Sequence, residues 1–145
     1  MAALTKSRDT RRRGPNIDMI LASPVAADAV IFRGALVAYN ADGYLVPATT
    51  ATTLTVIGRA DDEVDNTNGL DGAKSCNVRT NCVFAYANDG LDAIDQSHVG
   101  QLCYATDDQT VAATTGGDTK SAAGFVTGLA ASGEIWVLCL PHKIG

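Results

Sequence analysis

Short bursts of apolar residues, separated by turn residues, run along the chain from residue 17 to its end. Bursts of this length, with turns about every ten residues, are typical of strands in a sandwich or barrel. They do not fit alternating helices and strands. The sequence predicts an all-β fold with strands near residues 17–21, 30–31, 35–39, 44–46, 54–57, 77–87, 102–105, 110–113, 124–129 and 134–140.

Turn chemistry supports this pattern most clearly between the third and fourth bursts. Asn40, Ala41, Asp42 and Gly43 separate the two apolar runs. An Asp-Gly pair supplies the positive φ that a tight hairpin turn requires. The sequence therefore predicts a β-hairpin at this position.

Helical periodicity is almost absent from the sequence. Residues 92–99 are predicted to form one short helical turn, with Leu91, Ile94 and Val99 facing inward. The polar stretch 61–72 contains an Asn-Gly and an Asp-Gly pair and is predicted to be a long loop. We expect a small β domain with at most one short helix.

The chain divides into an arm and a body. Residues 1–16 contain few apolar residues and show neither a helical stripe nor strand alternation, which indicates an extended arm that orders on a partner. At 145 residues, the chain has room for one domain with one modest core. We predict an N-terminal arm at residues 1–16 and a single β domain at residues 17–145.

Charge separates the same two parts. The arm carries one acidic residue, Asp9, and five basic residues: Lys6, Arg8, Arg11, Arg12 and Arg13. The arm therefore has a net charge of +4, and because the whole chain has −5, the remainder carries −9. Such an arm suits an acidic surface of a protein or a nucleic acid, whereas the body repels polyanions. The five basic residues are our candidate contact residues.

Nucleic acid is the weaker of the two partner classes. Five cations neutralise few phosphates, so their binding is salt-sensitive. No aromatic residues lie between them to stack on bases. We expect no specific nucleic-acid partner.

The overall composition favours a protein that works inside an assembly. Charged residues make up 19% of the chain, below the usual quarter, while Ala, Thr and Gly are plentiful. This composition is typical of a sheet-rich domain that buries much of its surface in contacts with other chains. Trp136, in the apolar run 135–140, is predicted to be an anchor in the core or at an oligomer interface.

The chain has four cysteines without a regular framework spacing: Cys76, Cys82, Cys103 and Cys139. We expect free, buried thiols, since the cysteines lie on predicted strands. A zinc site is not favoured, because no second cysteine pair or histidine cluster follows Cys76 and Cys82. The two histidines, His98 and His142, are expected to have surface or capping roles.

Catalytic motifs are missing from the sequence. There is no phosphate-binding glycine loop, no Gly-x-Ser-x-Gly elbow and no His-Glu-x-x-His motif. The adjacent carboxylates Asp107 and Asp108 would point to opposite faces of a strand, which makes a shared acid–base site awkward. We expect a protein that is not an enzyme and has no cofactor.

An acidic, amide-rich cluster leaves one alternative open. Oxygen ligands of the kind that calcium prefers occur at Asp61, Asp62, Glu63, Asp65, Asn66, Asn68 and Asp71. The cluster lacks the residue order of an EF-hand loop. The alternative function is a calcium-dependent β domain, carbohydrate-binding or hydrolytic, that uses the Asp61 to Asp71 cluster.

No membrane partner is expected. The arginine triplet at 11–13 precedes a fairly apolar stretch, as in some export signals, but Asp18, Pro24 and Asp28 interrupt that stretch. No run approaches the roughly eighteen uninterrupted apolar residues of a membrane helix.

Several segments resemble small capsid-associated proteins of tailed bacteriophages. They are GRADDEVDNTNGLDGAKSCNVR at 58–79, VGQLCYATDDQTVAAT at 99–114, KSAAGFVTGL at 120–129 and GEIWV at 133–137. They look like the cement, or head-decoration, proteins encoded beside the major capsid protein. The resemblance covers most of the body, from about residue 30 to residue 137.

The resemblance implies a fold, a partner and a location. The fold would be a compact β-barrel or β-tulip domain, forming homotrimers on the capsid exterior, with an arm that reaches neighbouring subunits. The partner would be the major capsid protein, and the location the virion, after synthesis in the host cytoplasm. A third hypothesis, a DNA-contacting internal head protein, is disfavoured by the acidic body.

Overall fold

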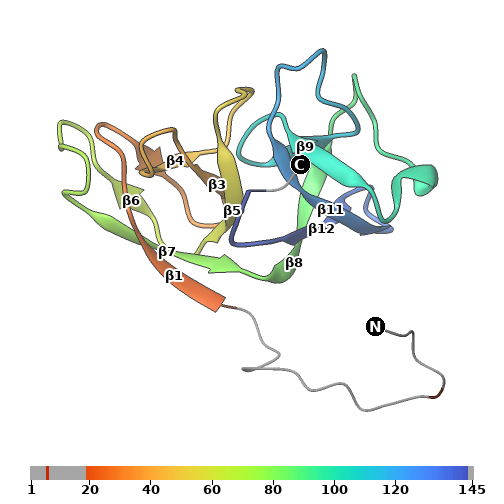
Figure 1. Cartoon of the computed structure of the whole chain (residues 1–145), viewed down its shortest axis with the longest axis horizontal. Helices are drawn as coiled ribbons and strands as arrows, with labels where there is room; N and C mark the ends of the chain where they lie inside the picture. Colours follow the sequence, from red (N-terminus) through yellow and green to blue (C-terminus); the bar gives the residue numbers. More distant parts are fainter. Residues whose placement is uncertain (1–5, 7–18, 144–145) are drawn as a thin grey trace.

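The computed structural model describes Lys6 and residues 19–143 (Figure 1). The all-β prediction is confirmed, because the one helical element among these residues is the 3-10 turn η1 (Gln96–His98). No helix in this part of the chain is long and apolar enough to cross a membrane. The strands are β1 (Met19–Pro24), β2 (Val30–Ile31), β3 (Leu36–Tyr39), β4 (Leu45–Pro47), β5 (Thr55–Ala60), β6 (Val64–Asp65), β7 (Ser75–Thr80), β8 (Cys82–Asn88), β9 (Leu102–Ala105), β10 (Thr110–Ala112), β11 (Ala122–Leu129) and β12 (Ile135–Cys139).

The first half of the chain forms an open antiparallel sheet in the order β1-β7-β5-β3-β4. A two-stranded ribbon of β2 and β6 packs at one end of it. A bridge between Val25 and Leu45 draws the chain after β1 toward β4. Val25, Ile31, Val37 and Ile57 are fully buried between these strands and form a core of their own.

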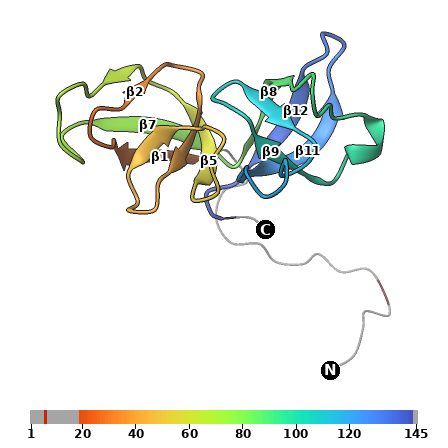
Figure 2. The same ribbon diagram turned by 90° about the horizontal axis from the view of Figure 1, so that it is seen from above.

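The second half closes into a five-stranded barrel in the order β10-β8-β12-β11-β9. Its pairs are antiparallel except β8 with β10, which run parallel. Inward-pointing residues alternate along β12, where Ile135, Val137 and Cys139 are all fully buried. Figure 2 shows the open sheet and the barrel side by side.

One hydrophobic core joins the barrel to the open sheet. Leu36, Leu54 and Val56 of the open sheet pack with the barrel interior in a single cluster. Backbone and side-chain hydrogen bonds cross the same boundary: the Leu36 amide donates to the Asp108 carbonyl at 2.7 Å, and the Ser121 hydroxyl donates to the Ala51 carbonyl at 2.5 Å. The two parts therefore share buried surface and polar contacts.

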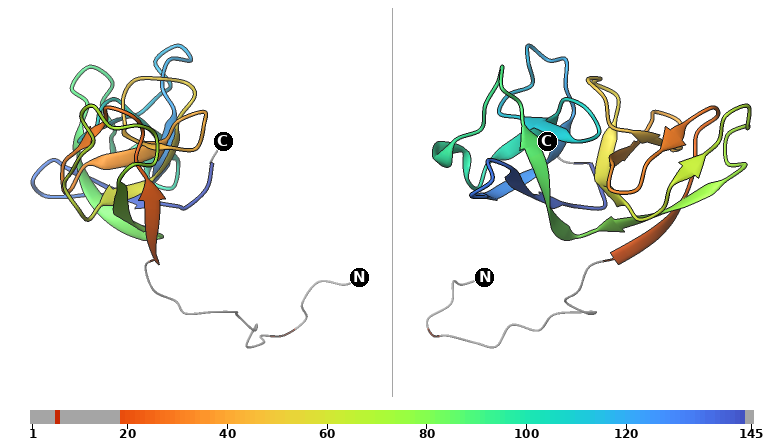
Figure 3. Two further views of the ribbon diagram at one scale, coloured as in Figure 1. Left: turned by 90° about the vertical axis from the view of Figure 1, so that its left-hand side faces the viewer. Right: turned by 180° about the vertical axis from the view of Figure 1, so that it is seen from behind.

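The chain passes from the open sheet to the barrel at Asn81, between β7 and β8, and Figure 3 shows the continuous green ribbon that joins the two parts. The prediction of one strand over 77–87 is wrong at this residue, because β7 ends at Thr80 and β8 starts at Cys82. Asn81 has a φ of 56°, in the left-handed region that asparagine tolerates better than most residues. Apolar periodicity continues across the break and so conceals it.

Local predictions outside the strands have mixed outcomes. The hairpin at Asn40 to Gly43 is confirmed: the Asn40 side-chain oxygen accepts from the amide of Tyr44 at 3.0 Å, and Gly43 has a φ of 86°. Ile94 is buried as predicted, but the inward orientation predicted for Leu91 and Val99 is wrong, because they are 100% and 38% exposed. The Leu91 amide donates to Asp89 in a turn, which points the side chain outward.

The barrel strands pack so closely at Gly124 that no side chain fits there. A Cβ on this residue would lie 2.2 Å from the Leu138 carbonyl oxygen and 2.9 Å from a Val137 methyl group. Gly124→Ala is expected to lower the free energy of unfolding by about 3 kcal/mol, because the clash involves backbone and core atoms. Urea denaturation followed by tryptophan fluorescence measures this loss. Gly90→Ala is the control, since a Cβ at Gly90 meets nothing within 4 Å; equal effects of the two substitutions would contradict the close packing.

Candidate interaction surface

The predicted contact residues of the arm lie almost entirely beyond the part of the chain that the structure describes. Lys6 is described and exposed. Arg8, Arg11, Arg12 and Arg13 lie outside the described residues. Their docking role stays a prediction, and the interaction surface has to be built from the body.

The outward side of three neighbouring barrel strands is apolar. In β8, β12 and β11, the residues between the buried positions face away from the barrel interior. Phe125 pairs with Leu138, which pairs with Val83, and Trp136 of the same strand pairs with Ala85. These five residues, Val83, Ala85, Phe125, Trp136 and Leu138, are called the outer apolar face below.

This face carries no charge. β8, β11 and β12 contain no Asp, Glu, Lys or Arg at any position. Val83 is 40% exposed and Trp136 is 42% exposed. A contiguous uncharged patch with an exposed aromatic residue has the composition of the centre of a protein–protein interface.

Trp136 was predicted to be an anchor in the core or at an oligomer interface, and the structure rules out the core. The residue is not a core anchor, because Ile135 and Val137 on either side of it point into the barrel and strand alternation turns the indole outward. The indole lies over Gly128, where an added Cβ would be 3.7 Å from its Cδ1 atom. Trp136 therefore shields a glycine on the neighbouring strand while part of it stays exposed, and the interface role stays a prediction.

The rest of the outer apolar face was missed by the sequence reasoning. The signal was present, because residues 82–88 and 135–139 both alternate strictly between buried and more exposed positions. Identifying the face required knowing that β8, β12 and β11 are neighbours, which the sequence pattern alone did not reveal.

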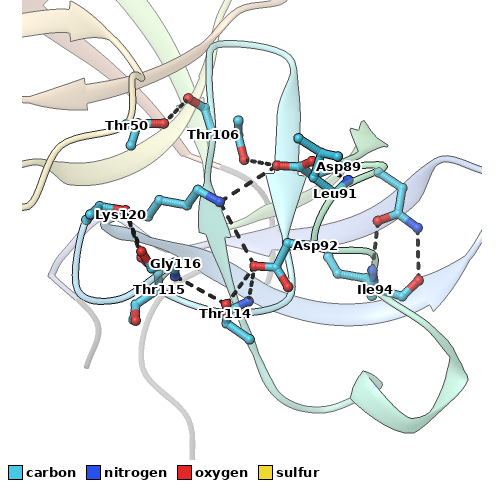
Figure 4. Close-up of polar contacts among 12 residues, drawn as sticks. Thr50, Asp89, Leu91, Asp92, Ile94, Thr106, Thr114, Thr115, Gly116 and Lys120 are labelled. Carbon is cyan, nitrogen blue, oxygen red and sulfur yellow. Dashed lines mark hydrogen bonds and ion pairs between the residues drawn. The ribbon is translucent and has the colours of Figure 1, made fainter.

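A charged network connects the loops at one end of the barrel (Figure 4). Lys120 Nζ lies 3.7 Å from Asp89 Oδ2 and 4.0 Å from Asp92 Oδ2. Asp92 also accepts from the amide and the hydroxyl of Thr114, at 3.0 and 2.6 Å. The three charged side chains are only 12 to 24% exposed, so the network ties together three loop segments rather than facing solvent.

Hydrogen bonding fixes the charge state of Asp89. The Leu91 amide and the Thr106 hydroxyl donate to its carboxylate, both at 2.9 Å. These bonds, with a smaller contribution from Lys120, hold the pKa of Asp89 below its usual value. A carboxylate held ionised by fixed donors is suited to bracing a loop and poorly suited to exchanging protons.

A second ion cluster lies on the open sheet near the barrel. Asp61 accepts from Arg59 at 2.7 Å and from Arg79 at 2.9 Å. Burial alone would raise the pKa of Asp61, but the two guanidinium groups outweigh it and lower the pKa. The Arg59 guanidinium also lies 5.1 Å from the centre of the Phe84 ring on β8, a cation–π distance. This cluster therefore links β5 and β7 to the barrel.

The carboxylates of the predicted acidic cluster do not point toward a common site where an ion could bind. Asp61 is paired with arginines, the Asp62 carboxylate accepts from the Asn77 amide, and the Asp71 carboxylate accepts from the Ala27 amide. Asn66 is buried, and its side-chain nitrogen donates to the Ala26 and Leu70 carbonyls. Within Lys6 and residues 19–143, no group of three His, Cys, Asp or Glu side chains is placed to hold a metal ion.

The cysteines are free thiols, as predicted. Cys76, Cys103 and Cys139 are buried, whereas Cys82 is only half-buried. Burial raises the pKa of both Cys103 and Cys139 to about 12, so these thiols stay protonated and poorly nucleophilic. The capping role of His98 is confirmed, since its Nδ1 accepts from the Asp95 amide at 2.9 Å.

A shallow cleft of about 270 Å³ lies between the open sheet and the barrel, with Leu54, Tyr104, Lys120 and Lys143 among its lining residues. Its volume is slightly below the range of typical small-molecule sites. Its buried lysine, Lys120, is already neutralised by Asp89 and Asp92. The cleft is therefore a weaker candidate site than the outer apolar face.

Comparison with known proteins returned no match: no family model, no curated protein and no solved structure is significantly similar to this chain.

The Asp89 carboxylate gives a pH-dependent contribution to stability. Because its folded-state pKa is lowered, the contribution is present above the ordinary aspartate pKa of 3.8 and is lost as the pH falls through the folded-state value. Asp89→Asn is expected to lower the free energy of unfolding at pH 7 by about 1 kcal/mol. Urea denaturation at pH 7 and pH 3 should show the difference from the unmodified protein shrinking at pH 3. Asp42→Asn, on an exposed turn, is the control. If the Asp89→Asn variant is destabilised as much at pH 3 as at pH 7, this role of Asp89 is contradicted.

The calcium alternative has a direct test. We expect the melting temperature to be the same in millimolar calcium and in excess chelator, because the carboxylates of the acidic cluster are separately engaged. A site occupied at a hundred times its dissociation constant would add about 2.7 kcal/mol of stability, which is several degrees in a domain of this size. A calcium-dependent rise of that size would restore the alternative.

Proposed function

We propose that this protein is a structural binding module: a capsid cement, or decoration, protein that binds the outside of a tailed-phage capsid and stabilises the shell. Its partner is the major capsid protein, and its location is the virion. The observation that carries the proposal is the outer apolar face, an uncharged and partly exposed surface across three adjacent strands.

The character of this face supports binding to a protein partner. Apolar surface at the centre of an interface gains free energy on burial, and aromatic residues contribute disproportionately. Trp136 and Phe125 provide that aromatic area on a rigid, closed barrel. Little ordering of the body would then be needed on binding, which favours affinity.

The charged clusters of the body support binding over catalysis. Asp89, Asp92 and Lys120 brace loops, and Asp61 holds two arginines. Each of these carboxylates already accepts from donors within the chain. Such groups stabilise a scaffold but are not free to transfer protons to a substrate.

The basic arm adds a second attachment element. Its net charge of +4 suits an acidic capsid surface, while the outer apolar face engages an apolar one. Two weak contacts on one chain bind collectively more strongly than either alone. A protein that bridges several capsid subunits in this way would resist the outward pressure of packaged DNA.

Co-sedimentation with capsid shells tests the proposal. Purified protein is mixed with shells assembled from the major capsid protein of the same phage, and the bound fraction is measured against protein concentration. Trp136→Ala is expected to weaken binding about tenfold or more, because an exposed aromatic anchor is removed from an interface centre. Deleting residues 1–13 should weaken binding more at low salt than at high salt, because salt screens the charges of the arm.

The matched control is Phe32→Ala. Phe32 is an exposed aromatic residue directly after strand β2 of the two-stranded ribbon, 57% exposed, and its removal should leave shell binding unchanged. The proposal fails if the unmodified protein does not sediment with shells, or if density for this chain is missing from electron-microscopy maps of the virion. Equal binding by the Trp136→Ala and Phe32→Ala variants would reject the outer apolar face as the docking surface.

A further inference from the structure

Two cysteines stand directly opposite each other on neighbouring strands of the barrel. Cys82 is the first residue of β8, Cys139 is the last residue of β12, and the antiparallel register pairs them. Phe84 and Val137 form a pair two residues further along the same register, and both are buried. Because alternate residues of a strand share a face, the side chains of Cys82 and Cys139 lie on the same inward face of the barrel wall.

The spacing of opposed residues suits a disulfide bond. In an antiparallel pair, the Cα atoms of directly opposed residues lie about 4.5 to 5.5 Å apart. Disulfide bonds join cysteines whose Cα atoms are roughly 4.4 to 6.8 Å apart. Both cysteines also stand at the ends of their strands, where the backbone adjusts most easily. Joining Cys82 to Cys139 therefore needs little movement of the backbone.

The fold selects this pair from the four cysteines. Cys76 lies on β7, in the separate core of the open sheet. Cys103 belongs to the same core as Cys139 and Cys82, but it lies on β9, and β11 separates β9 from β12. Two strand spacings of about 4.8 Å, even around a curved wall, put the Cα atoms of Cys103 and Cys139 roughly 8 Å or more apart. That distance exceeds the limit of about 7 Å for bridging without backbone movement.

We propose that Cys82 and Cys139 form a reversible disulfide bond when the protein meets an oxidising low-molecular-weight disulfide such as glutathione disulfide. The structure shows the reduced state of this pair, in which both thiols are free. The bond joins the first strand of the barrel in sequence, β8, to the last, β12. All five barrel strands and their connecting loops then lie within one covalently closed loop.

The exchange takes place in two steps. The half-buried Cys82 is the accessible thiol: it loses its proton, its sulfur attacks one sulfur of glutathione disulfide, and one glutathione thiolate leaves. Cys139 then loses its proton, attacks the Cys82 sulfur and displaces the second glutathione thiolate. The two protein thiols lose two electrons and two protons, and the glutathione disulfide is reduced to two thiols. The second step is slow, because burial raises the pKa of Cys139 to about 12 and keeps little of it as thiolate.

The bond changes the stability of the barrel without changing its fold. A covalent link between residues 82 and 139 restricts the unfolded chain far more than the folded one, in which these residues are already neighbours. Thiols stay reduced in a reducing cytoplasm and pair in oxidising surroundings. The barrel therefore folds with free thiols and becomes covalently closed after it leaves a reducing compartment. This proposal does not depend on binding to capsids, so either one can fail without the other.

Disulfide mapping tests the proposal on the full chain. The reduced protein is incubated with excess glutathione disulfide, the remaining thiols are alkylated after denaturation, and the digested peptides are identified by mass spectrometry. We expect one linked peptide pair that joins Cys82 to Cys139, with Cys76 and Cys103 alkylated. Cys82→Ala and Cys139→Ala should each abolish the link. Cys103→Ala is the matched control, because Cys103 and Cys139 are both fully buried in the same core, and it should keep the link.

Thermal melting provides an independent readout. The oxidised protein should melt about 10 °C above the reduced protein, dithiothreitol should remove the difference, and Cys82→Ala should show none. Cys82 is only half-buried, so this variant decides the test if Cys139→Ala does not fold. The proposal is overturned if all four thiols of the unmodified chain remain open to alkylation after oxidation, if the bond joins any other pair, or if Cys82 stops at a mixed disulfide with glutathione.

Discussion

The need to pair the backbone groups of every strand governs this structure. A strand presents donors and acceptors on both sides, and leaving them unpaired is costly once water is excluded. The barrel meets this requirement by closing β9 onto β10. The open sheet meets it at the β4 end through the Val25–Leu45 bridge, whereas β1 has a strand neighbour on one side only, β7, among the described residues.

Most of the secondary structure was predictable, because it depends on local alternation and turn chemistry. The strand over 102–105 and the turn at Asn40 to Gly43 follow from short-range patterns. The break at Asn81 was not predictable from such patterns, because the apolar run continues through a single residue with left-handed backbone. The outward orientation of Leu91 was not predicted either, since it depends on the hydrogen bond from the Leu91 amide to the Asp89 carboxylate in the turn. Which strands are neighbours depends on long-range contacts that periodicity does not encode.

The candidate surface was predictable only in part, for the same reason. Trp136 stood out by residue type, but its orientation follows from the buried positions on either side of it. Val83 and Phe125 become part of one face only when β8 and β11 are known to flank β12. The acidic residues at 61–71 looked like a ligand set because they are close in sequence. In three dimensions their carboxylates serve separate amides and arginines, so sequence proximity was misleading.

The register of β1 has a consequence for how the two candidate attachment elements work together. Met19 pairs with Thr80, and Val83 of the outer apolar face follows only three residues later. Residue 19, the first described residue after the arm, is therefore paired close to the first strand of that face. If the proposed partner binds that face, the basic residues that precede residue 19 in the sequence would meet it at a raised effective concentration. Residence time on a repetitive surface would then be set by the joint release of both elements, so that even modest individual affinities would give slow detachment.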